Sequence, residues 1–344
     1  MMTHKERFYA TIDRKKPDRP ASWLGMPVND TVPRLLEYFG VEDIRSLKEK
    51  LDDDIFPVEV PYHHPPENHI ACAFNFAKDR GGNYEERTLT NPGFFESISD
   101  PAAIDSFPWP VPHEHLDPYE CTETIAMAPE DYALLGMMWS AHFQDACAAF
   151  GMEAALIKMI TEPKIFQAVI DRIVEFYIDA NEIFYSAAGG KLDAVLIGND
   201  LGSQQGLMLS PRLIRKFVLP GTRKLIAQAK SFGFKVIYHS CGSIYDIIPD
   251  LIEAGVDAIH PIQPLAAKME PESLKRNFGG KVSFCGGVDT QDMLVNGTPD
   301  DVRKKVKQLK NMFPTGLIIS PSHEAVLPDI DPENIEALFE SVKD

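Results

Sequence analysis

The feature that most constrains the fold is a strict alternation of strand and helix patterns in the second half of the chain. Five apolar runs of strand length are each followed by a stretch with helical spacing, and Ser210-Pro211 are typical N-cap and first-turn residues. Runs that are apolar almost without interruption indicate parallel strands covered on both faces. The predicted strands are 192–200, 234–240, 257–263, 281–287 and 316–323, and the predicted helices are 210–233, 243–255, 270–279, 297–313 and 331–344.

The first half is less regular but supplies three further strands. Residues 21–26, 54–60 and 132–138 are predicted strands, and residues from about 165 to 188 predict one long helix. Eight strand-helix units in a chain of this length predict an α/β fold, a TIM (β/α)8 barrel with an N-terminal extension, as a single domain over residues 1–344. The rival is a doubly wound open sheet, which is disfavoured because no Gly-x-Gly-x-x-Gly follows any strand.

Residues 70–100 predict an insertion in this barrel. The stretch IACAFNFAKDRGGNYEERTLTNPGFFE has the pattern of an antiparallel hairpin, or flap, that turns at Gly81-Gly82. A proline-rich linker follows at 108–118. The hairpin aromatics are interpreted as packing residues, with a flap that lies over the substrate as the alternative; they are Phe74, Phe76, Tyr84, Phe94 and Phe95.

Charge and composition narrow the range of functions. The formal net charge of −17 disfavours an extended nucleic-acid surface, because phosphates would be repelled. No stretch approaches the roughly 20 apolar residues of a membrane span, and the first 20 residues lack the apolar core of a signal peptide. Five cysteines without a Cys-x-x-Cys pair are typical of reduced thiols, so a cytoplasmic location is expected.

Polar and soft-ligand residues gather where the predicted strands end. In a TIM barrel the active site lies at the C-terminal ends of the strands, so these residues are expected to face one another across the barrel mouth. They are Asn199 and Asp200, His239 and Cys241, Gln263, Cys285, Asp289, and His323 with Glu324.

His239 and Cys241 are the strongest candidates for a metal site. Residues two apart in a strand point to the same side, so the imidazole and the thiol converge, and Gly242 lets the backbone turn away. Zinc binds such donors at about 2.0–2.3 Å, and a catalytic zinc keeps one position open beside three protein ligands. His323 and Cys285 are the two candidates for the third ligand.

Each of these residues also has a structural interpretation. A His-x-Cys pair alone is a weak signal, because buried cysteines are common and histidines often satisfy local hydrogen bonds. Asp200 precedes a loop, which favours a role in the site, whereas Asp289 before Thr290-Gln291 favours helix capping. Trp139 lies just past a strand end, where it either lines a pocket or covers it, and for Glu324 a solvent-facing position is the simple interpretation.

Several segments of the chain resemble the uroporphyrinogen decarboxylase superfamily. They are THKERFYATIDRKKPDRP, NDLGSQQGLMLSP, HSCGSIYDIIPDLIEAGVDAIHPIQ, FCGGVDTQDMLVNGTPDDVRKKV and ISPSHEAVLPDIDPENIEAL, so the resemblance covers nearly the whole length. The superfamily is a TIM barrel. Its two broad branches are decarboxylases of a polycarboxylate porphyrinogen and zinc-dependent methyltransferases that exchange methyl groups with a corrinoid (cobalamin) protein.

The motifs resemble the methyltransferase branch more closely. Decarboxylases carry an Arg-Gln-Ala-Gly-Arg-type segment after the first strand, and the matching SWLGMPVNDTVPR lacks that arginine pair. The methyltransferases carry His-x-Cys at the end of the fifth strand, which His239-Ser240-Cys241 matches. They also carry a later cysteine, and here the chain departs from the pattern, because the nearest position is His323. His323 is therefore either a zinc ligand or a substrate contact, with Cys285 as the alternative ligand.

The resemblance implies a zinc-dependent methyltransferase that moves a methyl group between a small molecule, either a methoxylated compound or a thiol, and a corrinoid protein. The chain has no Asp-x-His-x-x-Gly signature, so methylcobalamin would be carried by a partner. Asp200 and His323 are the predicted catalytic residues, and Trp139, Asn199 and Gln263 the predicted substrate contacts. The oligomeric state is left open, with a homodimer as one arrangement.

Two alternatives compete with this function. The first is a decarboxylase of a carboxylated small molecule, with His323 and Asp200 in a metal-free pocket. The second is a barrel that only binds or delivers a ligand.

Overall fold

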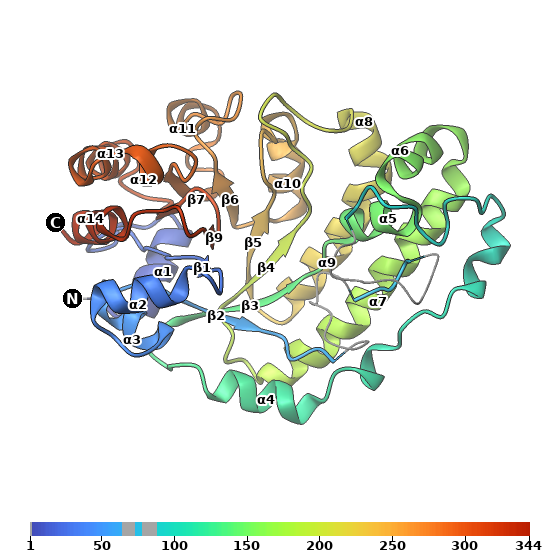
Figure 1. The fold of residues 1–344 in the computed structure, drawn as a ribbon, viewed down its shortest axis with the longest axis horizontal. Coiled ribbons are helices and arrows are strands. Elements are labelled where there is room, and N and C mark those ends of the chain that lie inside the picture. Colours follow the sequence, from blue (N-terminus) through green and yellow to red (C-terminus); the bar gives the residue numbers. More distant parts are fainter. Residues whose placement is uncertain (1, 64–72, 78–87) are drawn as a thin grey trace.

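A computed structural model describes residues 2–63, 73–77 and 88–344. Its centre is a parallel sheet in which every strand pairs with the next one in sequence (Figure 1). This order is the one that a sequence of βα units produces. The strands are β2 (Ile55–Glu59), β3 (Ala133–Trp139), β4 (Ala194–Gly198), β5 (Lys235–His239), β6 (Ala258–Ile262), β7 (Ser283–Val288) and β8 (Leu317–Pro321).

The extended segment 21–24 closes this sheet into a barrel. On one side the amide of Trp23 donates to the Ile319 carbonyl at 3.1 Å, and the amide of Ile319 donates to the Ala21 carbonyl at 2.9 Å. On the other side the amide of Asp54 donates to the Ser22 carbonyl at 3.2 Å. The segment therefore occupies the position of the eighth strand, between β8 and β2, and the predicted TIM-barrel architecture is confirmed.

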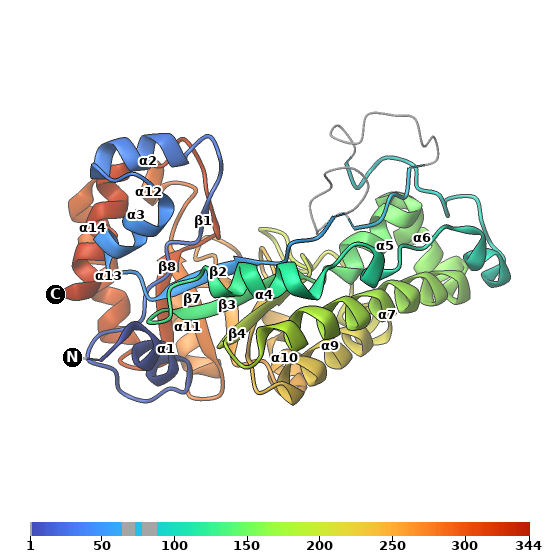
Figure 2. The same cartoon turned by 90° about the horizontal axis from the view of Figure 1, so that it is seen from below.

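Helices follow the strands and lie outside the barrel. Figures 1 and 2 show that α5, α6 and α7 extend the molecule to one side. The helices are α1 (His4–Ile12), α2 (Val32–Phe39), α3 (Ile44–Leu51), α4 (Pro118–Ala126), α5 (His142–Phe150), α6 (Met152–Thr161), α7 (Pro163–Ala188), α8 (Pro211–Leu213), α9 (Leu219–Ser231), α10 (Ile248–Ala254), α11 (Pro271–Phe278), α12 (Met293–Asn296), α13 (Pro299–Met312) and α14 (Pro332–Lys343).

One predicted helix is divided. Residues 210–233 form α8, a π-helical segment at Ile214–Val218, and α9. Ser210 is the N-cap as predicted, because its side chain accepts from the amide of Leu213. None of the helices in the described part of the chain is both long and apolar enough to cross a membrane.

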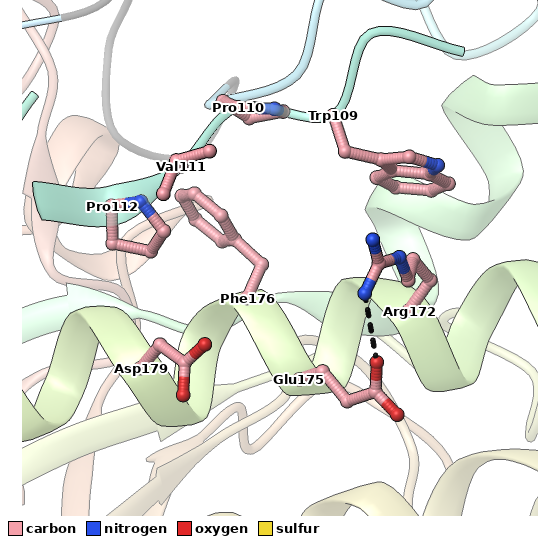
Figure 3. A pocket seen from close by; sticks show the side chains of 8 residues that line it. All are labelled: Trp109, Pro110, Val111, Pro112, Arg172, Glu175, Phe176 and Asp179. Atoms are coloured by element: carbon pink, nitrogen blue, oxygen red, sulfur yellow. Dashed lines mark hydrogen bonds and ion pairs between the residues drawn. The ribbon is translucent and has the colours of Figure 1, made fainter. Parts of the chain in front are cut away.

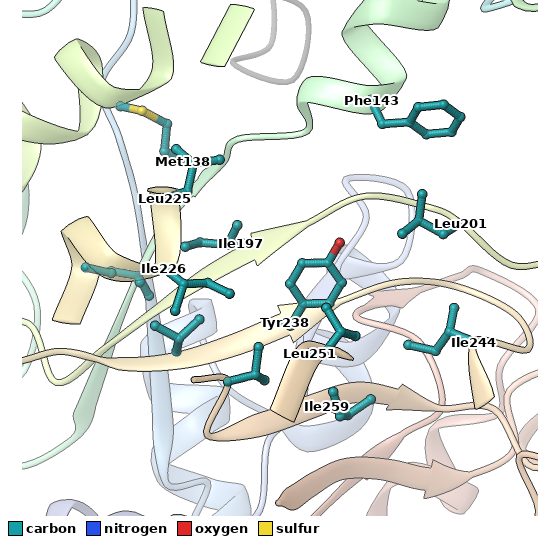
Figure 4. Close-up of a cluster of buried hydrophobic side chains, with 14 of the residues drawn as sticks. Met138, Phe143, Ile197, Leu201, Leu225, Ile226, Tyr238, Ile244, Leu251 and Ile259 are labelled. Carbon is teal, nitrogen blue, oxygen red and sulfur yellow. The ribbon is translucent and has the colours of Figure 1, made fainter. Parts of the chain in front are cut away.

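The alternation of side chains along β5 determines what enters the barrel. Ile237 belongs to the apolar cluster inside the barrel, together with Trp23, Leu196 and Ile318. Tyr238 belongs to the larger cluster between the sheet and the helices, which also contains Leu251 (Figure 4). Since neighbouring side chains of a strand point to opposite faces, His239 is directed to the same side as Ile237, toward the interior.

The predicted insertion is described only in part. Ala77 and Gly93 form an isolated antiparallel bridge, as expected for a hairpin, while the predicted turn at Gly81-Gly82 lies outside the described residues. Gly93 is required where it stands, because a Cβ there would lie 2.2 Å from the Ala149 carbonyl oxygen. The aromatic side chains that the structure describes pack as predicted, since the Phe76 ring stacks on that of Phe107 at 4.9 Å between centroids. Tyr84 lies outside the described residues.

Candidate metal centre

The loop after β5 holds an imidazole and a thiol close together at the barrel mouth. Sγ of Cys241 lies 3.5 Å from Nε2 of His239. Gly242 turns the chain here with a φ of +76°, and its backbone packs against that of Gly202 in the loop after β4. A Cβ on Gly202 would lie 2.7 Å from the Cys241 carbonyl oxygen, so only glycine permits this contact. The two loops thereby fix the position of the thiol.

Asp200 joins this pair from the end of the neighbouring strand. Its Oδ1 accepts from the amide of Cys241 at 2.9 Å and lies 3.3 Å from Nε2 of His239. One donor atom each of Asp200, His239 and Cys241 lies within 4.8 Å of the others, which is the convergence that a metal ion needs. Gln263 supports the loop, because its Oε1 accepts from the amide of Gly242 at 2.7 Å.

The three groups shift one another toward their charged forms. Burial alone would raise the pKa of the Cys241 thiol, but hydrogen bonds with His239 and His323 outweigh it and lower that pKa. Burial would likewise raise the pKa of Asp200, yet the contact with His239 brings it down to about 2. A thiolate is the form of cysteine that binds metals and attacks electrophiles, so this site favours the reactive form.

His323 approaches the same thiol from the loop after β8. Its ring centroid is 6.1 Å from that of His239, and its Nδ1 accepts from the amide of Ala325 at 3.0 Å. Burial lowers the pKa of His323, but the hydrogen bond with Cys241 raises it above its ordinary value. Because Nδ1 accepts from a backbone amide, Nε2 carries the ring proton and is the nitrogen that can donate to the Cys241 sulfur.

Glu324 does not face solvent, contrary to the simple interpretation of the sequence. Its side chain is only 11% exposed, and Oε2 lies 3.3 Å from Nδ1 of His239. His260 on β6 contacts the same nitrogen: the two Nδ1 atoms of His239 and His260 are 3.0 Å apart. His239, His260 and Glu324 thus form a second group of donors, below the first.

His260 escaped the sequence analysis because it lies within an apolar strand, DAIHPIQ. The register of the two strands brings it to the site, because His239 and His260 are partners on adjacent parallel strands, and the sequence alone does not give this register. Two histidines at matching positions of neighbouring strands lie side by side on the same face of a sheet.

Cys285 lies apart from this cluster. Its side chain is fully buried in the barrel interior, where Sγ is 3.6 Å from Oγ of Ser320, and burial raises the pKa of the thiol to about 12. It belongs to neither of the two donor groups found among the described residues. The geometry therefore does not bring it to His239 and Cys241.

Trp139 and Asn199, both predicted substrate contacts, lie in different positions. The Trp139 ring is perpendicular to that of His239 at 5.4 Å, and its φ of +62° marks a strained backbone at the end of β3. Asn199 is fully buried, and its Oδ1 accepts from the amide of Phe143 at 2.7 Å. Trp139 thus forms a wall of the site, whereas Asn199 connects β4 to the start of α5.

Asp289 caps the turn into α12, as predicted. Its Oδ2 accepts from the amides of Asp292 at 2.8 Å and Met293 at 3.1 Å. The carboxylate is therefore occupied by backbone donors and is not directed at the metal centre.

A separate groove of about 160 Å³ lies between α7 and the proline-rich linker. Figure 3 shows Trp109 of the linker beside Arg172, whose guanidinium pairs with Glu175 at 3.3 Å. This pair lies along α7, and none of the metal-centre donors lines the groove.

Together, the fold and the donor set define a β/α barrel with a thiol, an imidazole and a carboxylate converging at its mouth. The family model described as uroporphyrinogen decarboxylase (URO-D) matches residues 70–344, so the chain belongs to that family, and the predicted resemblance is confirmed.

Both a methyltransferase and a uroporphyrinogen decarboxylase are similar to the chain in sequence. It is 26% identical over 152 residues to a methylated-thiol–coenzyme M methyltransferase of Methanosarcina mazei, covering 43% of this chain and 37% of that protein. It is 24% identical over 192 residues to the uroporphyrinogen decarboxylase of Chlorobaculum tepidum, covering 54% of this chain and 51% of that one. The chain thus matches about half or less of the length of these curated relatives.

A solved structure extends the comparison to the whole fold. A methyltransferase from Methanosarcina mazei superposes with a TM-score of 0.69 over 99% of this chain and 98% of that chain, at 16% sequence identity. At this identity the similarity establishes the shared fold.

Proposed function

We propose that this protein is a zinc-dependent methyltransferase that moves a methyl group between a small molecule and a corrinoid carried by a partner protein. The observation that carries the proposal is the convergence of the Cys241 thiol, the His239 imidazole and the Asp200 carboxylate at the barrel mouth. The similarity to a methylated-thiol–coenzyme M methyltransferase supports the same function.

The residues present fit a zinc ion. A thiolate, an imidazole and a carboxylate are the ligands that zinc prefers, and here one atom of each lies within reach of a common centre. His239 and Cys241 would hold the metal, with Asp200 as the third protein donor and His323 as the competing one. Zinc bound there supplies a Lewis acid that stabilises a thiolate or a departing alkoxide.

The side chains around that centre would orient the substrate and handle its proton. The indole of Trp139 forms an apolar wall beside His239, against which a methyl-bearing group can pack. Nε2 of His323 carries the ring proton, because Nδ1 accepts from the amide of Ala325, so this nitrogen can donate to a thiolate or to a leaving oxygen. Gln263 and Asn199 act indirectly, because each of them positions a loop of the mouth.

Exposed apolar side chains around the barrel mouth support the proposal that a partner protein docks there. Met208, Leu265 and Leu327 are 37%, 58% and 49% exposed, and they lie on segments that follow β4, β6 and β8. Parallel strands present such segments at the same end of the barrel, around its mouth. Apolar residues in this position are typical of a surface that another protein covers.

A decarboxylase is the second candidate, favoured by the similarity to the Chlorobaculum tepidum enzyme. In that reaction Asp200 and His323 would act on a carboxylated substrate without metal. The two functions differ in one measurable property, the need for zinc.

The first experiment is therefore elemental analysis of purified wild type, His239→Ala, Cys241→Ala and Cys285→Ala, with methyl transfer from methylcobalamin assayed in parallel. We expect one zinc per chain in the wild type and in the Cys285 variant, which is the matched control for loss of a thiol. Zinc and methyl transfer should both be lost in the other two variants, because each removes a ligand.

Two further variants, Asp200→Asn and His323→Ala, identify the third donor by which of them loses zinc. A wild type without metal after zinc reconstitution, or unchanged turnover in Cys241→Ala, would contradict the proposal.

A further inference from the structure

The two ring nitrogens of His239 face two different sets of groups. Nε2 faces outward, toward Sγ of Cys241 at 3.5 Å and Oδ1 of Asp200 at 3.3 Å. Nδ1 faces inward, toward Nδ1 of His260 at 3.0 Å and Oε2 of Glu324 at 3.3 Å. The outer set belongs to the metal centre, whereas the inner set contributes no donor to it.

The inner set is deeply buried and contains polar atoms without partners. His260 is fully buried, and its ring lies 5.1 Å from that of Trp23 across the barrel interior. Among the described residues, no hydrogen-bond partner reaches Nε2 of His260, Nε1 of Trp23 or Oε2 of Glu324. Glu324 is close enough to His239 for charge attraction, but no donor is aligned with its Oε2.

Such an arrangement is costly for the fold. A buried polar group without a partner destabilises a protein by about 1–3 kcal/mol, and apolar residues of similar shape would avoid this cost. Packing alone therefore does not explain why His260 and Glu324 occupy these positions. Their contacts with His239 do explain it.

The position of one proton on His239 decides whether it can bind metal. A neutral imidazole carries its proton on one nitrogen only, and the other nitrogen presents the lone pair that a metal needs. If the proton is on Nε2, it points at Asp200 and blocks the metal centre. If it is on Nδ1, it is donated to Nδ1 of His260, it faces the Glu324 carboxylate, and Nε2 is free.

We infer that His260 and Glu324 are positioning residues, which hold the proton of His239 on Nδ1 and so present Nε2 to the metal. The inference rests on the proposed zinc site. His260 accepts through Nδ1 and keeps its own proton on Nε2, the nitrogen without a partner. Glu324 attracts the Nδ1 proton and increases the basicity of the ring, as carboxylates behind metal-bound histidines do.

Zinc affinity tests this inference directly. We would measure the zinc dissociation constant by competition with a chromophoric chelator for wild type, Glu324→Ala, His260→Leu and His260→Asn. Glu324→Ala and His260→Leu should each weaken binding roughly 10- to 100-fold, the usual effect of losing a residue that orients a metal-bound histidine. His260→Asn should stay within about threefold of wild type, because its Oδ1 replaces Nδ1 as the acceptor.

Two further measurements separate positioning from a general structural effect. Asp246→Ala is the matched control, because it removes an exposed carboxylate five residues beyond Cys241 that pairs with Lys268. It should leave the affinity unchanged. Nitrogen NMR of isotope-labelled histidine, in zinc-free protein at a pH where His239 is neutral, should place its proton on Nδ1 in the wild type and on Nε2 in His260→Leu.

The outcomes are distinct. Equal zinc affinity in wild type, Glu324→Ala and His260→Leu, or an equal loss in the Asp246 control, overturns the inference while the zinc site stands. A wild type that binds no zinc overturns the proposed function and this inference with it.

Discussion

The barrel has two clusters of buried charge, one at each end, and they differ in how completely they are paired. At the base, just before β2, the fully buried Asp54 accepts from Nη1 of Arg7 at 2.6 Å, from Nη1 of Arg19 at 2.7 Å and from the amide of Ser22 at 2.8 Å. At the mouth, Glu324 and His260 keep atoms for which the described residues provide no hydrogen-bond partner.

This difference separates residues that hold the fold from residues that hold a ligand. The base also contains Asp53, whose Oδ2 accepts from Nζ of Lys48 at 2.6 Å and from the amide of Leu24 at 3.0 Å. Its donors come from α3 and from the segment that closes the barrel, so pairing at the base joins distant parts of the chain. At the mouth, His260 and Glu324 instead lie behind His239, and the atoms that they leave without a hydrogen bond add nothing to the fold.

The largest effect on stability should come from the base. Asp54→Ala leaves Arg7 and Arg19 buried without their shared carboxylate, and breaking such a pair costs about 3–5 kcal/mol. Urea unfolding measures this loss, and zinc content should remain at the wild-type value. Asp52→Asn is the control, because its side chain is 41% exposed and such pairs contribute at most about 1 kcal/mol. If Asp54→Ala lowered the free energy of unfolding by less than about 1 kcal/mol, the base would not be the more tightly paired end of the barrel.

The same carboxylate should make the base sensitive to acid. Burial would raise the pKa of Asp54, but hydrogen bonding to His4 and the charges of Arg19 and Arg7 outweigh it and lower that pKa. A carboxylate with a lowered pKa stabilises the fold above its unfolded-state pKa of about 3.9. This stabilisation is lost as the pH falls toward the folded-state pKa.

Unfolding of wild type and Asp54→Asn between pH 7 and pH 3, measured at equal ionic strength, isolates this contribution. The difference in stability between the two proteins should shrink as the solution becomes more acidic. A difference that is constant over this range would show that Asp54 does not titrate with folding.

The smallest effect on stability should come from the mouth. In the absence of metal, Cys241→Ala should change the free energy of unfolding by no more than about 0.5 kcal/mol. The reason is that Cys241 is only partly buried, so its replacement removes no core packing. Its loss of zinc should nevertheless be complete. A large loss of stability in this variant would remove the distinction between the two ends of the barrel.

The second half of the fold was predictable because its strands are buried on both faces. Runs such as 234–240 are almost entirely apolar, which makes them recognisable as strands. Asp200, His239 and Cys241 follow the C-terminal ends of such strands, and the structure brings them together as predicted. Residues 21–26 were predicted as a strand, but the pairing of the segment 21–24 with Ile319 and Asp54 was not predictable, because these partners lie elsewhere in the sequence.

The inner part of the site was not predictable in the same way. Glu324 follows His323 in an irregular segment, where the sequence does not determine which side chain points inward. His260 is hidden by the apolar residues around it, and its role depends on the register between β5 and β6. Both residues act through contacts between segments, which spacing along one strand does not reveal.

The closure of the barrel has a consequence for how the protein is made. The segment around Trp23 is synthesised before the backbone of Ile319, with which it pairs and which follows about 300 residues later. At roughly 5–20 residues per second, this interval lasts on the order of 15–60 seconds. During that time the unpaired β-edges of the nascent chain are exposed to aggregation, so molecular chaperones are expected to protect this protein until its last strand has been synthesised.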